Sequence, residues 1–485
     1  MGAIVIGFIF LAYTGHGRRL QPHFQQEESG SRVGHVSATK EKDVRLCLNL
    51  CATWRRLQSP GRSKVCQPLK LLAVLLVAFN LPRPALRTSE RSHSFLAGGS
   101  PRGLHALSKP CCKRSCAAVS MGPEDNVGTS TGKILILGGG VIGVSIAYHL
   151  ALRDVPVSLV DRAGIASCAS GKAGGFLARN WNDFSPVGDL TRKSFDMHEE
   201  VAQALGLKSY RRLTCKGVGV DGTGSKPAGK KLENLEWTDL GVQGSRQMGD
   251  ERTIAQVLPK ELVDAMWSYA EGKGSTFTKG VVEGLTYKDA AEGKMLEGAI
   301  VDGQLLSADK VVCTMGPWGR VLQQALPRCQ MYGIKYHSVL MRTGRVLNEA
   351  VFFSGLGDPE VYPRNDGDTY VTGFPDPGTI VDEIPGEVEV REDVCERLVS
   401  TMQMVSSEMK GADVTKKQSC YLPFTVDNNP CMGLLPGHAN AYVATGHGCW
   451  GILNSLASGL AMSELILDGS ATSVDLAPFS PARFA

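Results

Sequence analysis

Residues 134–143 read ILILGGGVIG, an apolar run that passes without a break into the pattern Gly138-x-Gly140-x-x-Gly143. The apolar run predicts a buried β-strand, and the apolar spacing after the glycines predicts a helix. Glycines at these positions let the backbone turn sharply and approach a pyrophosphate, whose charge faces the helix N-terminus. Asp161 closes the next apolar run, where a carboxylate can hydrogen-bond a ribose. The sequence therefore predicts a dinucleotide site, without saying which dinucleotide.

Two other segments bear on the identity of that dinucleotide. Residues 167–181 read SCASGKAGGFLARNW, a loop of small residues that can bring backbone N–H groups close to a planar ligand. Lys172 in this loop could place a positive charge near a phosphate or a reduced cofactor, and the alternative is a flexible surface loop. Residues 442–451 read YVATGHGCWG, and the helix predicted after them should stop at Gly469. The N-terminus of this second helix is expected to point into the same crevice.

These segments together resemble the FAD-dependent amine oxidoreductases of the D-amino acid oxidase, glycine oxidase and sarcosine oxidase superfamily. The resemblance covers about residues 131–485. The segment ASGKAGGF is similar to the corresponding sequence in a poorly characterised eukaryotic subgroup. An NAD-linked dehydrogenase is disfavoured, because the loop GHGCWG has no role there. Four further segments follow in the family's order: 311–318 with a Gly-Pro-Trp turn, 360–373 (EVYPRNDGDTYVTG), 425–433 (TVDNNPCMG) and 446–447 (Gly-His).

The resemblance implies an α/β protein in which a Rossmann-like FAD-binding domain is interleaved with a second domain. The first domain is expected to hold a central parallel sheet flanked by helices, and the second, substrate-binding domain to be mostly antiparallel α+β. The expected FAD-binding domain comprises 131–205, 266–324 and 421–485, and the expected substrate domain comprises 206–265 and 325–420. The two domains should share one crevice, which is the usual place for a ligand.

The resemblance also implies a set of residues that would bind FAD. They come from the glycine loop, the end of the next strand, the small-residue loop, the returning strands and the C-terminal loop. The expected FAD-binding residues are Gly138, Gly140, Val141, Ile142, Gly143, Asp161, Arg162, Ala169, Ser170, Lys172, Gly174, Gly175, Val282, Gly316, Trp318, Gly446, His447, Gly451 and Ile452.

The chain departs from its relatives where they hold a substrate carboxylate. Glycine oxidase-like members carry an arginine three residues before the threonine of the T-x-D segment, where this chain has Leu422. They carry a tyrosine four residues before the arginine of the PR pair, where this chain has Glu360. Both changes remove carboxylate recognition, so an ordinary amino acid substrate is in doubt. Glu360 would then meet a cationic amine or be a solvated strand carboxylate.

No catalytic residue can be assigned, and three residues are weak candidates. Glu360 is one. His447 would position the flavin through its backbone or act as a base, and Trp450 would cover the pocket or pack beneath it. The predicted function is oxidation of a small amine or an amino- or hydroxy-acid-like compound by hydride transfer to flavin N5. The alternative is a catalytically inactive FAD-binding protein with a binding or trafficking role. The electron acceptor would be oxygen or another, unknown acceptor.

The first 120 residues differ in composition from the rest. They carry 18 Lys/Arg and 5 Asp/Glu, a balance of +13 that leaves −9 for the remainder of a chain whose net charge is +4. A basic, acid-poor segment predicts targeting rather than nucleic-acid binding, and its apolar stretches are too short for a stable membrane span. Residues 1–130 are therefore expected to be a targeting or disordered leader, for a plastid or alternatively a mitochondrion. Met121 is an alternative start of translation.

The 14 cysteines show no metal-site spacing, so no metal is expected. Cys420 stands five residues before Thr425. In the sarcosine oxidase branch a cysteine at that offset attaches the flavin covalently, so covalent attachment through Cys420 and a coincidence of spacing both stay open.

Overall fold

The computed structural model describes residues 132–221, 235–289 and 294–485. The strand and helix predicted around the glycines are present: β1 spans Ile134–Leu137 and α4 spans Val141–Ala151. Every residue of β1 is buried, as expected for the centre of a parallel sheet. The leader lies outside the described residues, so its expected role stays a prediction.

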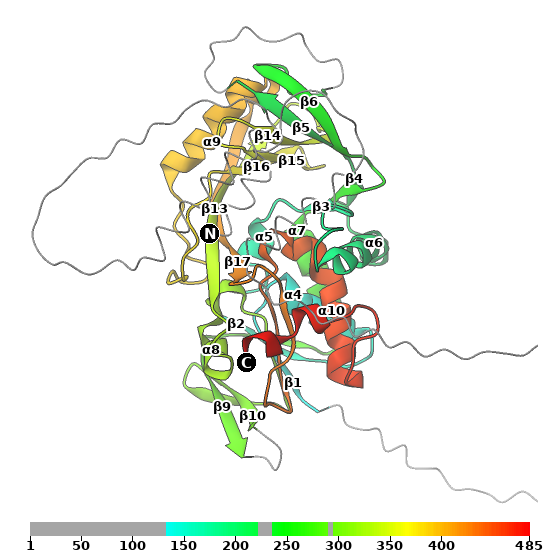
Figure 1. Ribbon diagram of the computed structural model, residues 1–485, viewed down its shortest axis with the longest axis vertical. Coiled ribbons are helices and arrows are strands. Elements are labelled where there is room, and N and C mark those ends of the chain that lie inside the picture. The colour runs from blue at the N-terminus through cyan, green and yellow to red at the C-terminus, as the bar shows by residue number, and fades with distance from the viewer. Residues whose placement is uncertain (1–131, 222–234, 290–293) are drawn as a thin grey trace, which may run out of the picture. The chain divides into compact units, whose positions relative to one another are not determined.

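A six-stranded sheet is built around β1 (Figure 1). All its strands run parallel except β18, which is antiparallel to β19 at one edge. The strand order is β18 (Cys431–Leu434), β19 (Ala441–Thr445), β12 (Lys310–Cys313), β1, β2 (Ser158–Asp161) and β8 (Thr276–Lys279).

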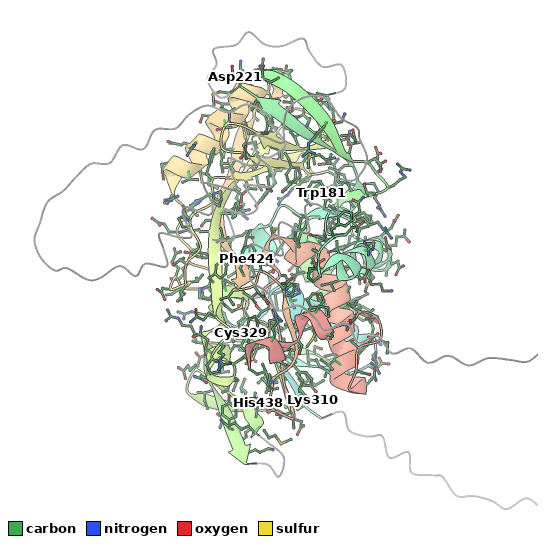
Figure 2. The ribbon with its side chains drawn as sticks, viewed as in Figure 1. Trp181, Asp221, Lys310, Cys329, Phe424 and His438 are labelled. Atoms are coloured by element: carbon green, nitrogen blue, oxygen red, sulfur yellow. The ribbon has the colours of Figure 1, made fainter. Side chains whose placement is uncertain are left out.

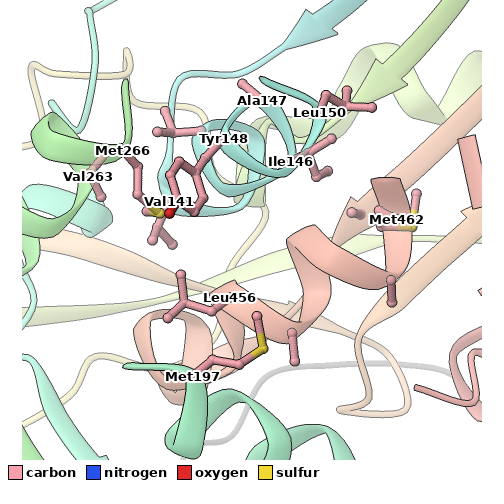
Figure 3. Packing of buried hydrophobic residues seen from close by; sticks show 14 of the residues in the cluster. Val141, Ile146, Ala147, Tyr148, Leu150, Met197, Val263, Met266, Leu456 and Met462 are labelled. Atoms are coloured by element: carbon pink, nitrogen blue, oxygen red, sulfur yellow. The ribbon is translucent and has the colours of Figure 1, made fainter. Parts of the chain in front are cut away.

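The two faces of this sheet are covered differently. One face carries the helices α4, α6 (Gly188–Leu205), α7 (Pro259–Gly272) and α10 (Gly451–Asp468). Figure 3 shows side chains of α4 and α10, among them Ile146, Leu456 and Met462, meeting in that core. The other face carries α8 (Leu322–Ala325) and a three-stranded antiparallel sheet of β9 (Val282–Asp289), β10 (Lys294–Val301) and β11 (Gln304–Ser307).

The long C-terminal helix α10 ends at Gly469, which has a left-handed φ of 80° as the sequence predicted. The segment Gly448–Asp468 is long and apolar enough to cross a bilayer by composition, yet 67% of its apolar window is buried inside the protein. Because α10 packs on α4 and α6, its apolar composition is explained by the core.

A seven-stranded sheet forms the second large layer (Figure 1). Only β14 and β5 pair in parallel; the other neighbours are antiparallel. Its order is β17 (Asp413–Thr425), β13 (Met331–Arg342), β16 (Asp368–Gly373), β15 (Glu360–Pro363), β14 (Glu349–Ser354), β5 (Thr214–Val220) and β6 (Val242–Gly249).

The side chains of this sheet alternate between two environments. One face, with Val339, Val351 and Val371, packs against α9 (Glu392–Val405). The opposite face carries Phe352, Tyr362 and neighbouring aromatic side chains. A small sheet of β3 (Phe176–Ala178), β7 (Ile254–Gln256) and β4 (Arg211–Arg212) completes the molecule, and β3 and β7 contribute to the same aromatic cluster.

The expected domain boundaries stay a prediction, although two elements cross them. Helix α7 spans the boundary at 265, and its Val263 and Met266 both pack in the core of the six-stranded sheet. Strand β17 spans the boundary at 420 and remains paired with β13 as far as Thr425. The loop expected at 167–181 contains a one-turn helix, α5 (Ala169–Lys172), and the strand β3.

Candidate active site

A cavity of about 320 Å³ opens at the carboxyl ends of the parallel strands. Its walls come from the residues directly after β1, β2, β12 and β19, and from the start of α10. On its other side lie Leu422 and Pro423 of β17, so the two large sheets enclose it together. A crevice beyond the carboxyl ends of parallel strands is where α/β proteins bind dinucleotides.

The first glycine of the pattern is required by the backbone. Gly138 has a φ of +119°, and a Cβ there would lie 2.6 Å from the carbonyl oxygen of Thr314. The hydroxyl of Thr314 is 3.0 Å from the carbonyl oxygens of both Leu137 and Gly138, which holds the turn against β12. The third glycine, Gly143, packs equally closely, because its Cβ would meet the Gly138 carbonyl at 2.1 Å. These two glycines shape the turn.

The second glycine leaves room for a ligand instead. A Cβ on Gly140 would meet only the Ser170 hydroxyl, at 3.2 Å, and Gly140 lines the cavity. The backbone N–H of Val141, at the start of α4, donates to the same hydroxyl at 2.8 Å. The loop at 167–181 is therefore tied to the glycine turn at the point where a pyrophosphate would meet the helix N-terminus.

Asp161 lies at the end of β2 and lines the cavity. Its carboxylate accepts a hydrogen bond from Gly139 N at 2.8 Å, and others from Ala163 N at 2.8 Å and Gly164 N at 2.9 Å. The predicted bond to a ribose stays a prediction, and the structure adds a second role: the carboxylate holds the glycine turn and the following loop together.

Most of the expected FAD-binding residues come together in this cavity. Those that line it are Gly138, Gly140, Val141, Ile142, Asp161, Arg162, Ala169, Ser170, Val282, Gly316, Trp318, Gly446, His447, Gly451 and Ile452. Four do not line it, and each packs elsewhere. Gly143 packs inside the turn, Lys172 Nζ donates to Ser419 O at 3.1 Å, Gly174 faces Tyr362, and Gly175 faces Val257.

The start of α10 points at the cavity, as the sequence predicted, through Gly451 and Ile452, and the 3-10 turn before it adds Gly448 and Cys449. His447, just before it, is buried, and its Nε2 lies 3.0 Å from the Ser458 hydroxyl. Burial lowers the pKa of His447 to about 4, so its ring is neutral at physiological pH. The geometry favours a positioning role for His447 over that of a base.

Glu360 and Trp450, the other two weak candidates, lie beside the cavity. Glu360 is on β15, on the sheet face that carries Phe352 and Tyr362, and accepts a hydrogen bond from the Tyr362 hydroxyl. Burial raises the pKa of this carboxyl, and the bond from Tyr362 opposes that rise only in part. Trp450 is half-buried in the aromatic cluster, with its ring centroid 6.2 Å from that of Trp181.

The cavity has no buried cation among its lining residues. The two arginines that line it, Arg162 and Arg320, are exposed, and Arg320 is ion-paired with Asp382. Lys335 lies on the other face of β13, where its Nζ is 3.2 Å from Glu383 Oε2. Leu422 lines the cavity at the position where glycine oxidase-like relatives carry arginine. The lining therefore offers hydrogen-bonding backbone and apolar surface rather than a carboxylate clamp.

Sequence reasoning missed several residues of the site. Thr314 and Cys449 adjoin motifs that were recognised, and only their neighbours in the chain could have indicated them. Cys168, which lines the cavity, accepts a hydrogen bond from the Cys420 thiol. This contact and burial raise the pKa of Cys420, which keeps it a protonated, poor nucleophile. Covalent attachment of the flavin through Cys420 stays untested.

The fold and the cavity define the class of protein: a dinucleotide-binding α/β protein with a second sheet over its site. The model of the DAO family, FAD dependent oxidoreductases, matches residues 133–465, and the chain belongs to this family. The expected family and fold class are confirmed, and the protein is an FAD-dependent oxidoreductase.

Several known proteins are similar over most of the chain. A putative oxidoreductase of Schizosaccharomyces pombe is 29% identical over 382 residues, 72% of this chain and 97% of the relative. A glycine oxidase of Geobacillus kaustophilus is 24% identical over 377 residues, 72% of this chain and 96% of the relative.

Two solved structures have the same fold. The structure of glycine oxidase from Geobacillus kaustophilus has a TM-score of 0.61 at 22% identity and covers 73% of this chain and 99% of its own. The structure of L-proline dehydrogenase from P. horikoshii has a TM-score of 0.61 at 18% identity. The match covers 73% of this chain and 97% of the L-proline dehydrogenase chain.

The residues present fit FAD, the expected cofactor. Gly140 leaves the space that a Cβ would fill, and the starts of α4 and α10 both face the cavity. Gly138, Gly140 and Ser170 would hold the pyrophosphate, and Asp161 the adenosine ribose. Val281 and Val282 line the cavity and would meet the adenine, and Gly448, Cys449, Gly451 and Ile452 also line it. The N-terminus of α10 would stabilise negative charge on the reduced cofactor.

Proposed function

We propose that this FAD-dependent oxidoreductase oxidises a small amine or hydroxy compound. Bound FAD supplies the chemistry, since it accepts a hydride from a carbon next to nitrogen or oxygen. The observation that carries the proposal is one continuous cavity that runs from the glycine turn to the start of α10 and to β17. The protein's residues would orient the substrate there, shield it from water and stabilise the charge that develops.

The charges around the cavity support a substrate other than a simple α-amino acid. A buried carboxylate without a cationic partner costs several kcal/mol, which corresponds to roughly several powers of ten in affinity. Lys172 and Lys335, which could have supplied such a cation, are bonded to Ser419 O and Glu383 away from the lining. Leu422 cannot supply one.

The test is a reduction screen on purified holoprotein. FAD content is measured first, and the flavin is then exposed without oxygen to small amines, hydroxy compounds, glycine, D-alanine and sarcosine. We expect at least one amine or hydroxy compound to bleach the flavin and the three amino acids to do so poorly. Rapid bleaching by any of the three amino acids contradicts the substrate class. A bound flavin that photoreduction bleaches but no compound reduces would favour the inactive FAD-binding protein.

A further inference from the structure

Next to the proposed active site, a buried carboxylate sits in an aromatic wall. Glu360 on β15 keeps part of its surface accessible, and the atoms packed around its carboxyl group raise the pKa of that group. Among the described residues its hydrogen-bond partner is the Tyr362 hydroxyl, and it forms no ion pair with any of them. An uncompensated buried carboxylate is costly, and natural proteins keep such groups mainly where they serve a function.

The register of the seven-stranded sheet places aromatic side chains around Glu360. Phe352 on β14 is directly opposite Glu360, so the two side chains are neighbours on the same face. The Tyr362 ring stacks on Phe176 at 5.0 Å and on Tyr370 at 5.8 Å between centroids.

Trp181 and Trp450 extend this group of aromatic side chains toward the start of α10. The Trp181 ring centroid lies 5.0 Å from that of Phe352 and 6.2 Å from that of Trp450. Figure 2 shows Trp181 between the strands of the seven-stranded sheet and α6. Trp450 directly precedes α10, so the wall meets the end of the cavity where that helix begins.

Glu360 also interacts electrostatically with a residue that lines the cavity. Burial and then the charge of Glu360 raise the pKa of the Cys449 thiol, and Cys449 lines the cavity. The carboxyl group therefore lies within electrostatic reach of a molecule bound at the start of α10. No cation contributes to the shift in the pKa of Glu360.

Arg364 and Arg246 lie on this sheet face. Arg364 donates to Ala173 O at 3.2 Å and stacks over the Tyr370 ring at 5.5 Å. Arg246 on β6 is opposite Gly217 of β5, and its Nε would lie 3.1 Å from a Cβ on that glycine. Gly217 is in turn opposite Phe352, in the row of the sheet that leads to Glu360, so the test below includes an anionic probe.

We propose that the substrate binds as a cation, with its protonated amine paired to Glu360 and its alkyl groups against Phe352, Trp181 and Trp450. Aromatic faces attract cations through their quadrupoles, and most strongly when water is excluded. A carboxylate inside an aromatic wall thus selects an amine cation over a neutral or anionic molecule of the same size. This inference rests on the proposed function, because it names the substrate class of the same site.

The experiment compares three small molecules of similar shape that the enzyme cannot oxidise: tetramethylammonium, tert-butanol and trimethylacetate. Each is titrated into the FAD-loaded protein, and binding is followed by the visible flavin spectrum and by tryptophan fluorescence. We expect tetramethylammonium to bind at least about tenfold more tightly than the other two, because a desolvated ion pair and cation–π contacts are available only to the cation.

Two variants and a control test whether Glu360 and the aromatic side chains around it cause this preference for the cation. Glu360→Gln should weaken tetramethylammonium by roughly 10- to 100-fold, since the ion pair between the carboxylate and the quaternary cation is lost. It should leave tert-butanol affinity and FAD content unchanged. Phe352→Leu keeps an apolar side chain and should weaken only the cation, by a few-fold. Glu396→Gln, an exposed charge removal on α9, should change nothing.

The outcomes separate this inference from the proposed function. Tighter binding of trimethylacetate, or unchanged tetramethylammonium affinity in Glu360→Gln, overturns the inference while an amine-reducible flavin still supports the function. Protein that binds tetramethylammonium through Glu360 but whose flavin no amine or hydroxy compound reduces supports the inference and contradicts the function. If Glu360→Gln lost FAD, the wild-type comparison and Phe352→Leu would still decide.

Discussion

At the scale of single residues, the three glycines of the turn differ in what they do. Gly138 adopts a left-handed φ and has no space for a Cβ, whereas Gly140 has an ordinary φ of −75° and faces the cavity. Substitutions at these two positions should therefore separate folding from cofactor binding.

Gly140→Val should abolish FAD binding while the protein stays folded, because the valine side chain occupies the space of the pyrophosphate. Gly138→Ala should instead destabilise the fold, because its Cβ would meet the Thr314 carbonyl at 2.6 Å. FAD content and urea unfolding of both variants provide the measurement. Stoichiometric FAD in Gly140→Val would show that this loop does not hold the cofactor.

Asp161→Ala should weaken FAD by roughly 1.5–3 kcal/mol, the value of a charge-assisted hydrogen bond to the ribose. The sequence alone predicted only the contact between Asp161 and the ribose. Because the carboxylate also accepts three backbone N–H bonds, we now expect the FAD-free variant to unfold at lower urea as well. A dissociation constant equal to that of the wild type would rule out the ribose contact.

At the scale of elements, the junction of β12 with β1 depends on one hydroxyl. Thr314→Val keeps the shape of the side chain but removes the hydrogen bond to the turn. We expect a loss of about 0.5–1.5 kcal/mol in the free energy of unfolding, the net value of a buried hydrogen bond. Urea unfolding measures it, with Ser400→Ala on the exposed side of α9 as the control. Unchanged stability would mean that the hydroxyl does not hold the turn.

The affinity of the site for tetramethylammonium should depend on pH, because Glu360 on β15 titrates. Tetramethylammonium does not titrate, so its affinity should follow the ionised fraction of Glu360. Since burial raises the pKa of Glu360 above its ordinary 4.5, the affinity should fall as the pH decreases through that raised pKa.

The tyrosine and cysteine side chains around Glu360 do not titrate in the pH range of the experiment, so Glu360 is the group that does. Tyr336, Tyr362, Tyr370, Cys449 and Cys215 all have pKa values raised by burial, so they stay neutral from about pH 5 to pH 8. In Glu360→Gln the affinity for tetramethylammonium should be low and independent of pH. A wild-type affinity that does not change with pH would contradict ion pairing at Glu360.

At the scale of the whole molecule, every helix and strand described lies within 120–485, which forms one compact unit. A chain that begins at Met121 should therefore bind FAD and show the same flavin spectrum as the longer protein. Loss of FAD on this truncation would show that the first 120 residues take part in folding.

The basic leader should direct a fused fluorescent protein to plastids, or alternatively to mitochondria. The physical basis is its excess of Lys/Arg over Asp/Glu, which is typical of targeting segments. Microscopy of the fusion and the N-terminal sequence of the mature protein provide the measurement. Full-length chain in the cytosol would count against both compartments.

The amino-acid sequence by itself determined the parts of the protein that depend on nearby residues. The strand, glycine turn and helix at 134–151 follow from apolar periodicity and from the need for glycine where the backbone turns. The end of α10 at Gly469 follows in the same way. These features depend on short-range sterics and hydrogen bonds, which a window of neighbouring residues contains.

Only the tertiary structure decided which distant side chains meet. Lys172 was expected near the cofactor. In the structure its Nζ donates to the carbonyl oxygen of Ser419, which lies 247 positions further along the chain. The surroundings of Glu360 depend on the register of β14 and β15 and on the loop that brings Trp181 over them. A strand pattern states that alternate residues share a face, but the partner strand and the burial of a charge are set only when the sheets pack.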